Sequence, residues 1–180
     1  VATIMGNKKT PRRALPKEVR REQLIQATMT SIAENGLSGT TIATVTREAG
    51  LSLGIANLHF ESKEKLLSET LQYVTDEYTC GHRAILGNNK FDTVADKIKA
   101  ILDFDLSPKV INKKKLAVWV AFWGEAKARP VYQRIRAQAD IEIEGGYRKV
   151  FQAAIDEAGY ANADAALLAR GYTALIDGLW

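Results

Sequence analysis

The chain has 180 residues, of which 46% are hydrophobic and 26% are charged. This composition is typical of a soluble globular protein with a sizeable hydrophobic core, and it excludes disordered and fibrous chains. The formal net charge is +4, from 25 basic and 21 acidic residues.

The positive charge is concentrated at one end of the chain. Residues 1–21 contain seven basic residues against the single acidic residue Glu18, so this segment carries +6 and the other residues carry −2. A basic arm on a slightly acidic body indicates a polyanionic partner, with nucleic acid favoured over a membrane surface. A solvated tail without a partner is the alternative.

Several classes of site are not expected. Cys80 is the only cysteine and there are two histidines, so neither an intramolecular disulfide nor a Cys/His metal cluster is expected, and no cofactor is indicated. The longest apolar run, residues 116–123, is far shorter than the roughly 20 residues that span a bilayer. Residues 1–5 are apolar and precede the basic cluster, the reverse of the signal-peptide order. We therefore expect a cytoplasmic protein without a membrane partner.

Helical periodicity recurs along almost the whole chain, and no segment shows the alternation of a strand. In the first part, apolar spacing predicts a helix over residues 16–34 that stops at Asn35 and Gly36. Thr40 or Thr41 caps a short helix that Gly50 ends, and two further helices are expected to begin at Ser52 and Ser62.

In the second part, helices are expected from Val94 to Ser107, from the lysines at 113–115, from Pro130 to Ala158, and from Asn162 or Asp164 to the end. The last of them shows no stop signal, and its apolar end suggests a helix that continues and packs against a partner. The predicted fold is all-α: an arm at 1–15, a helix-turn-helix domain at 16–61 and a helical domain at 62–180.

Residues 41–66 contain the helix-turn-helix pattern, in which two short helices are joined by a turn of about four residues that contains glycine. Ala49 permits close approach of the two helices, Gly50 is free to adopt a positive φ, and Ser52 caps the second helix. An ordinary helical hairpin gives a similar pattern, but the basic arm upstream favours DNA binding.

The second helix of this pattern is short and polar at its tip. Ile55 and Leu58 are expected to pack inward, and Phe60 belongs to the core. The side chains then left exposed are Ser52, Leu53, Asn57 and His59.

Residues 41–52 and 59–67 resemble the DNA-binding signature of the TetR family of transcriptional repressors. The most specific part is the pattern F-x-x-K-x-x-L at residues 60–66. The chain departs from the usual signature at His59, where the family usually has Tyr, and at Thr46, where Ala is more usual. The resemblance implies a three-helix DNA-binding domain followed by a larger helical-bundle domain for effector binding and dimerisation.

In this interpretation the helix from Ser52 to His59 enters the major groove, where Asn57 reads an adenine edge and Leu53 contacts a thymine methyl. Lys63 adds its charge to a helix dipole at a phosphate. The alternative for Asn57 is a helix C-cap, and for His59 a wedge between domains. The residues expected to contact DNA are Arg12, Arg13, Thr41, Ser52, Leu53, Gly54, Asn57, His59 and Lys63.

A second motif is the aromatic stripe of Trp119, Phe122 and Trp123, which fall at i, i+3 and i+4 and share one helix face. Core packing is the default for such a stripe. The functional alternative is an aromatic cage for an organic cation, with Tyr147 and Phe151 facing it from the next long helix. The carboxylates near that helix segment are Asp140, Glu142 and Glu144, and a solvated acidic face is the simpler interpretation of them.

Residues 117–123 and 174–180 are similar to segments of the BetI subgroup, the choline-responsive repressors of glycine betaine synthesis. This resemblance implies a homodimer, paired through its C-terminal helices, that binds double-stranded operator DNA and releases it when choline binds. The alternatives are a repressor for another lipophilic or cationic compound and a DNA-binding protein without an effector. The candidate effector-binding residues are Trp119, Phe122, Trp123, Asp140, Glu144, Tyr147, Phe151, Asp177 and Trp180.

An enzyme is not expected. Nucleophilic or acid–base chemistry needs histidine or cysteine brought together with partners by the fold. His59 falls in the presumed DNA-binding helix, and Cys80 and His82 are expected to follow a helix end.

Overall fold

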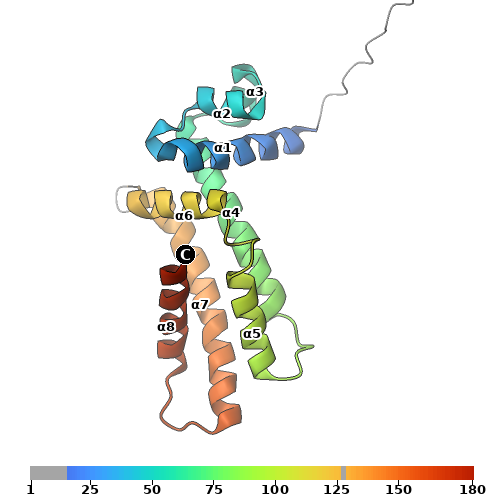
Figure 1. Cartoon of the computed structure of the whole chain (residues 1–180), viewed down its shortest axis with the longest axis vertical. Helices are drawn as coiled ribbons and strands as arrows, with labels where there is room; N and C mark the ends of the chain where they lie inside the picture. Colours follow the sequence, from blue (N-terminus) through green and yellow to red (C-terminus); the bar gives the residue numbers. More distant parts are fainter. Residues whose placement is uncertain (1–15, 127–128) are drawn as a thin grey trace, which may run out of the picture.

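The computed structural model describes residues 16–126 and 129–180, and every regular element within those ranges is an α-helix. The expected all-α class is therefore confirmed. The first three helices form one end of an elongated molecule, and the following helices make up the rest of it (Figure 1). Residues 1–15, the basic arm, lie outside the described residues. None of the described helices has both the length and the apolar character that crossing a membrane requires.

The first helix, α1 (Lys17–Gly39), buries the apolar positions that its sequence spaces at helical intervals, including Leu24, Ile25 and Ile32. The expected stop at Gly36 is present as a break inside α1. Gly36 has a φ of 69°, which glycine adopts without a Cβ clash, and one more turn follows before Thr40.

The next two helices, α2 (Ile42–Ala49) and α3 (Leu53–His59), lie across α1 and complete a three-helix unit (Figure 1). Phe60 follows α3 and is buried, as the sequence predicts. Most of the buried residues around this unit come from α1 and from the start of the following helix, because α2 and α3 bury few side chains of their own.

The long helix α4 (Lys63–Leu86) leaves this unit and runs into the rest of the molecule (Figure 1). The Ser62 hydroxyl accepts a hydrogen bond from the Lys65 amide at 3.1 Å and so caps the helix as expected. The expectation that Cys80 and His82 follow a helix end is wrong, because both lie within α4. Cys80 is exposed and His82 is buried.

Four helices complete the chain: α5 (Val94–Asp105), α6 (Lys113–Ala126), α7 (Pro130–Ala158) and α8 (Ala165–Leu179). α7 and α8 run antiparallel, and the end of α8 returns to the side of α6 (Figure 1). The Asp164 carboxylate caps α8 by accepting hydrogen bonds from the Leu167 and Ala166 amides, and these bonds lower the pKa of Asp164.

One hydrophobic core joins the three-helix unit to the helical body. It contains Leu24, Phe60 and Leu66 from the first part together with Val118 and Tyr132 from α6 and α7. α1 packs directly against α6. The two parts are therefore connected by α4 and by the α1–α6 contact.

Candidate functional sites

The turn between α2 and α3 has the geometry that the sequence predicts. Gly50 lies in the left-handed region with φ 62° and ψ 34°, and its amide donates to the carbonyls of Arg47 and Thr46. The Ser52 hydroxyl accepts a hydrogen bond from the Ile55 amide and caps α3. These contacts fix the angle between α2 and α3, which decides where the second helix points.

The outer face of α3 carries most of the residues that the sequence analysis assigned to DNA. Ser52, Leu53, Gly54 and Asn57 are exposed. Leu58 is 70% exposed, so the expectation that it packs inward is wrong, since Ala56 takes the buried position instead. α3 continues two residues beyond Asn57 to His59, which excludes the C-cap role for Asn57.

Three other expected DNA contacts already have partners or are partly covered. Thr41 forms a capping box with Thr44, whose hydroxyl accepts a hydrogen bond from the Thr41 amide at 2.8 Å. His59 is half-buried, and its Nδ1 has no hydrogen-bond partner among the described residues. The Lys63 ammonium lies 3.5 Å from the Ser38 carbonyl, a long contact that leaves it available to a phosphate.

The described part of the basic segment is partly used within the protein. Arg21 forms an ion pair with Glu69 of α4, and its guanidinium lies 5.8 Å from the centroid of the Phe60 ring. Arg20 donates to the Gln23 side chain. Arg12 and Arg13, the arm residues expected at DNA, fall outside the described residues.

A cavity of about 150 Å³ lies between α4, α6, α7 and α8. Apolar cavities of roughly this size hold ligands as large as benzene. Of the nine candidate effector-binding residues, the ones that line it are Trp119, Trp123, Asp140, Glu144, Tyr147, Asp177 and Trp180.

Three aromatic rings form one side of this cavity. The Trp119 and Trp180 rings are stacked, with centroids 6.4 Å apart and an interplanar angle of 29°. Tyr78 of α4 meets them edge-on, at 6.1 Å from Trp119 and 5.5 Å from Trp180. Such rings present the electron-rich faces that attract an organic cation.

Acidic residues and one arginine form the other side. The Arg136 guanidinium lies 4.7 Å from the centroid of a Trp123 ring, 3.1 Å from Asp140 and 3.4 Å from Asp177. Burial raises the pKa of the Asp177 carboxyl, and the positive charge of Arg136 opposes that rise. The protein's own arginine therefore contacts the kinds of group that would bind a ligand cation.

A buried polar cluster holds two of the aromatic rings in place. Asp105, at the end of α5, is fully buried and accepts hydrogen bonds from the hydroxyls of Tyr78, Tyr147 and Tyr172 at 2.8, 3.1 and 2.7 Å. His82 Nε2 lies 3.0 Å from the same carboxylate. The Trp180 indole donates to the Asp105 carbonyl at 3.3 Å, so one residue orients side chains from α4, α7 and the end of the chain.

Burial raises the pKa of all three tyrosine hydroxyls in this cluster, and the Asp105 carboxylate raises it further. The phenols therefore remain protonated and act as donors. No group of three or more His, Cys, Asp or Glu side chains within the described ranges is arranged to hold a metal ion.

Comparison with known proteins places the chain in a family. Residues 24–70 match the model for bacterial regulatory proteins of the tetR family, and residues 94–180 match the model for the C-terminal part of BetI-type transcriptional repressors. The HTH-type transcriptional regulator BetI of Stenotrophomonas maltophilia is 33% identical over 90% of this chain and 80% of its own length. The chain belongs to the TetR family, in its BetI-type branch. The BetI regulator of Burkholderia thailandensis is also 33% identical, over 91% of this chain and 81% of its own.

Solved structures share the TetR-family fold. A transcriptional regulator from Pseudomonas aeruginosa PAO1 superposes with a TM-score of 0.80 at 27% identity, over 97% of this chain and 83% of that one. A regulator from Saccharomonospora viridis in complex with choline has a TM-score of 0.78 at 21% identity, over 90% and 83% of the two chains. TetR-family members are transcriptional regulators and not enzymes, in agreement with the sequence analysis.

Two of the nine candidate effector-binding residues do not line the cavity. Phe122 does not line the cavity, because it is buried in the main core with its ring 4.6 Å from that of Tyr132. Phe151 lies in the other core cluster, against Tyr172. Glu142, which was not among the nine, is partly exposed outside the cavity and pairs with Arg83 of α4, and this pairing lowers the pKa of Glu142.

Three residues in or next to the cavity were not predicted from the sequence: Tyr78, Arg136 and Asp105. Arg136 and Asp140 have the i, i+4 spacing of a helical ion pair, which is a detectable signal. Tyr78 and His82 share the same spacing and point to one face of α4. Nothing in the sequence marks Asp105, because its three tyrosine partners lie 27, 42 and 67 residues away.

Proposed function

We propose that the chain is a repressor that binds operator DNA as a homodimer and is released by a quaternary ammonium compound such as choline. The observation that carries the effector assignment is the pairing of the Trp119, Trp180 and Tyr78 rings with the Asp140 and Asp177 carboxylates around one cavity. Rings and carboxylates together are the groups that bind an organic cation. The choline complex of the Saccharomonospora viridis regulator and the names of the BetI relatives support the same assignment.

Two residues of the cavity lining carry a buried polar atom without a partner, which favours a ligand that also has a hydroxyl. Thr75 Oγ1 and Trp123 Nε1 are buried and have no hydrogen-bond partner among the described residues, and both residues line the cavity. A buried donor or acceptor without a partner costs free energy, which a ligand hydroxyl would recover. Choline has such a hydroxyl and tetramethylammonium does not.

A thermal-shift and calorimetric screen of the full chain tests this assignment. We expect choline and tetramethylammonium to raise the melting temperature, with choline the stronger, because ligands that bind only the folded state stabilise it. Betaine aldehyde and glycine betaine test whether the site binds a ligand that has an aldehyde or a carboxylate in place of the hydroxyl. If none of the four binds at millimolar concentration, the quaternary ammonium effector is excluded, and a repressor for another lipophilic or cationic compound becomes the better proposal.

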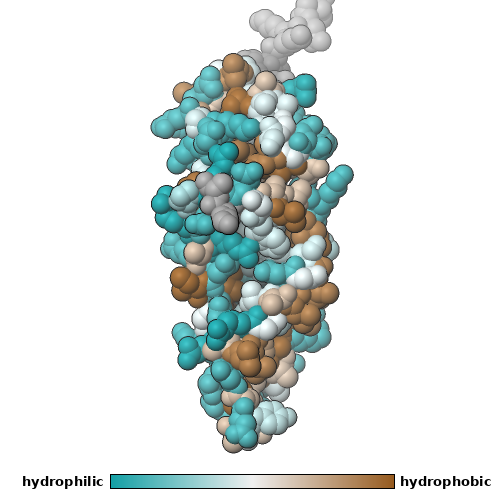
Figure 2. All heavy atoms as spheres, turned by 90° about the vertical axis from the view of Figure 1, so that its left-hand side faces the viewer, coloured by the Kyte–Doolittle hydropathy of each residue, from teal (hydrophilic) through white to brown (hydrophobic). Residues whose placement is uncertain are grey.

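We infer that α8 and the adjoining face of α7 form the homodimer interface. α8 exposes a row of leucines, and Ile141 of α7 is 75% exposed. The face of the molecule that includes α8 shows several separate apolar patches (Figure 2). Exposed apolar surface of this kind is typical of helix–helix pairing between subunits. The leucines are Leu167, Leu168, Leu175 and Leu179.

Introducing charge on α8 should separate the subunits. We expect the double substitution Leu168→Glu and Leu175→Glu to give a monomer in sedimentation experiments and to weaken operator binding about 100-fold or more, because a dimer engages two half-sites at once. Leu106→Glu is the matched control, since Leu106 is exposed on the loop after α5. If the double variant stays dimeric, the homodimer interface lies on another surface.

The proposed DNA contacts give a prediction about specificity. We expect Asn57→Ala to cost about 1–3 kcal/mol on the preferred operator and to relax the preference at one base position. Lys63→Ala should weaken binding to all sequences alike and reduce the salt dependence by about one counterion. Competition binding on a set of single-base operator variants, at several salt concentrations, separates the two effects. Equal effects of both variants on all sequences would place Asn57 outside the base-reading surface.

The helices around the cavity provide a route from effector to DNA. The two recognition helices of a dimer must lie about 34 Å apart to enter successive major grooves. α4 contributes Thr75 and Tyr78 to the cavity and begins directly after α3, while α6 contributes Trp119 and packs on α1. An effector that prefers another position of these helices must lower the affinity for DNA, and DNA must lower the affinity for the effector by the same factor.

A further inference from the structure

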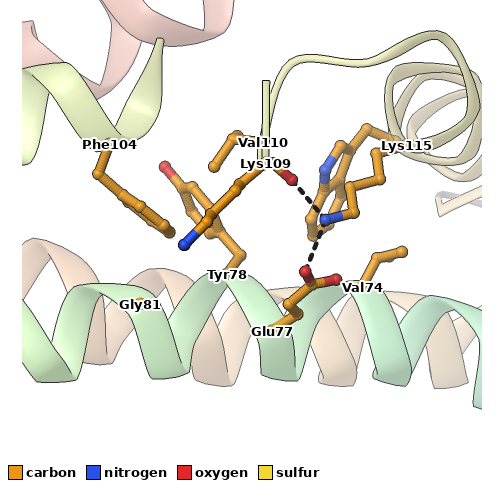
Figure 3. Close-up of a pocket in the computed structure, with 9 residues that line it drawn as sticks. Val74, Glu77, Tyr78, Gly81, Phe104, Lys109, Val110 and Lys115 are labelled. Atoms are coloured by element: carbon orange, nitrogen blue, oxygen red, sulfur yellow. Dashed lines mark hydrogen bonds and ion pairs between the residues drawn. The ribbon is translucent and has the colours of Figure 1, made fainter. Parts of the chain in front are cut away.

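A second cavity, of about 310 Å³, lies between α4, the end of α5, the loop that follows it and the start of α6 (Figure 3). It shares Tyr78 and Trp119 with the effector cavity and no other residue. Volumes of about 300 Å³ and above are typical of small-molecule sites. This second cavity has a different set of charges from the first.

Its apolar wall is built from three aromatic rings. Tyr78 stands between Phe104, whose ring is stacked at 6.0 Å with an interplanar angle of 22°, and Trp119, whose ring meets it at 6.1 Å and 68°. A Cβ at Gly81 would lie 2.1 Å from the Phe104 ring, so only glycine lets this ring lie against the backbone of α4. A ligand with a flat or branched apolar body fits such a wall.

The charged groups of this cavity are two lysines and one glutamate. The Lys115 ammonium is held by Glu77 at 2.8 Å and by the Lys109 carbonyl, and its side chain is only 15% exposed. The Lys109 ammonium reaches across the cavity toward Tyr78 and Phe104 (Figure 3). No ion pair or hydrogen bond of that ammonium is formed with the residues that the structure describes.

We propose that this second cavity binds a small monoanion with an aromatic or branched apolar body, such as an aryl carboxylate. Glu77 neutralises Lys115, so the lining carries one uncompensated positive charge, that of Lys109. A carboxylate placed beside Lys109 forms a charge-assisted hydrogen bond while its body lies against the rings. A cation is disfavoured because it would meet Lys109 with like charge.

Direct titration of the full chain with benzoate and phenylacetate tests the proposal, with benzyl alcohol and benzylammonium as the neutral and cationic counterparts. We expect both carboxylates to bind saturably and more tightly than either counterpart. Lys109→Met should weaken phenylacetate binding about tenfold, because a hydrogen bond to a charged group is lost, and should leave benzyl alcohol binding unchanged. Glu77→Gln frees Lys115 and should favour the dianion phthalate over benzoate.

Lys114→Met is the matched control. Lys114 lies on the first turn of α6, is exposed and does not line the cavity, so the variant removes the same charge from the protein without touching the site. The proposal is overturned if neither carboxylate binds at millimolar concentration, if the two lysine variants have equal effects, or if benzylammonium binds as tightly as phenylacetate. These outcomes do not depend on the quaternary ammonium effector, because the readout is direct binding of the anion.

The shared wall predicts coupling between the two cavities. Tyr78 and Trp119 border both, so a ligand that shifts either ring in one cavity changes the other. We expect phenylacetate at saturation to change the affinity for tetramethylammonium at least threefold, and tetramethylammonium to change the affinity for phenylacetate by the same factor. This step rests on the proposed effector. Phenylacetate binding without any such change would leave the anion site in place and remove the coupling.

Discussion

Asp105→Ala is expected to lower the free energy of unfolding by about 3–5 kcal/mol. Asp105 is fully buried and accepts hydrogen bonds from Tyr78, Tyr147 and Tyr172, with His82 3.0 Å away. Truncation leaves these polar groups buried without an acceptor, and each such group carries a desolvation cost. Urea denaturation at fixed protein concentration measures the change, and the melting temperature should fall by roughly 6–20 °C.

Asp103→Ala is the control for this prediction. Asp103 lies two residues earlier on α5, where it is exposed and paired with Lys99 at 2.6 Å. An exposed helical pair of this kind contributes about 0.3–0.5 kcal/mol, so the control should remain close to wild type. Asp105→Asn keeps one carbonyl acceptor, so its free energy of unfolding should lie between those of the Asp103→Ala and Asp105→Ala variants. Equal stability of the Asp103 and Asp105 variants would contradict the role given to the buried cluster.

Asp105→Ala should also damage the effector cavity. Tyr78 and Trp180 are both oriented by Asp105, through its carboxylate and its carbonyl, and both rings line the cavity. Tyr172→Phe removes one hydrogen bond of the cluster and keeps the ring that packs on Tyr147, and Tyr172 itself does not line the cavity. It should therefore cost stability while leaving effector affinity nearly unchanged, and this difference separates packing from ligand binding.

The helix-turn-helix unit was predictable from the sequence because its signals are local. Gly50 needs a positive φ, Ser52 caps the next helix, and both act within four residues along the chain. The prediction for Leu58 was wrong. Its apolar character predicts burial, yet Ala56 takes the buried position of α3 and the Leu58 side chain is 70% exposed.

The effector cavity was only partly predictable because its residues come from four helices. The stripe of Trp119, Phe122 and Trp123 shares one face of α6, but that face meets two different neighbours. Phe122 faces Tyr132 in the core, whereas the two tryptophans reach the cavity. Periodicity fixes which residues share a helix face, and it does not say which part of that face meets a core and which meets a cavity.

Arg136→Met is expected to tighten the binding of tetramethylammonium about tenfold. In the free protein the Arg136 guanidinium lies over Trp123 and pairs with Asp140 and Asp177, so a ligand cation must compete with it for the same aromatic face and the same carboxylates. A cation–π contact and partly exposed ion pairs together account for about 1–2 kcal/mol, which corresponds to about tenfold. Methionine keeps the apolar stem of arginine and removes its charge. Calorimetric titration measures the affinity directly.

The sign of the effect distinguishes competition from a structural role. If Arg136 only supports the fold, Arg136→Met should lower the affinity for the ligand, as any loosening of the cavity would. If Arg136 occupies the cation site, Arg136→Met should raise the affinity for the ligand. Arg136→Lys should leave that affinity near the wild-type value, and Asp177→Asn should lower it. Arg134→Met is the matched control, since Arg134 is exposed on the same helix and does not line the cavity. Because release of Arg136 frees α7 from Asp177 of α8, the competition also gives the effector a direct way to loosen the contact between these two helices.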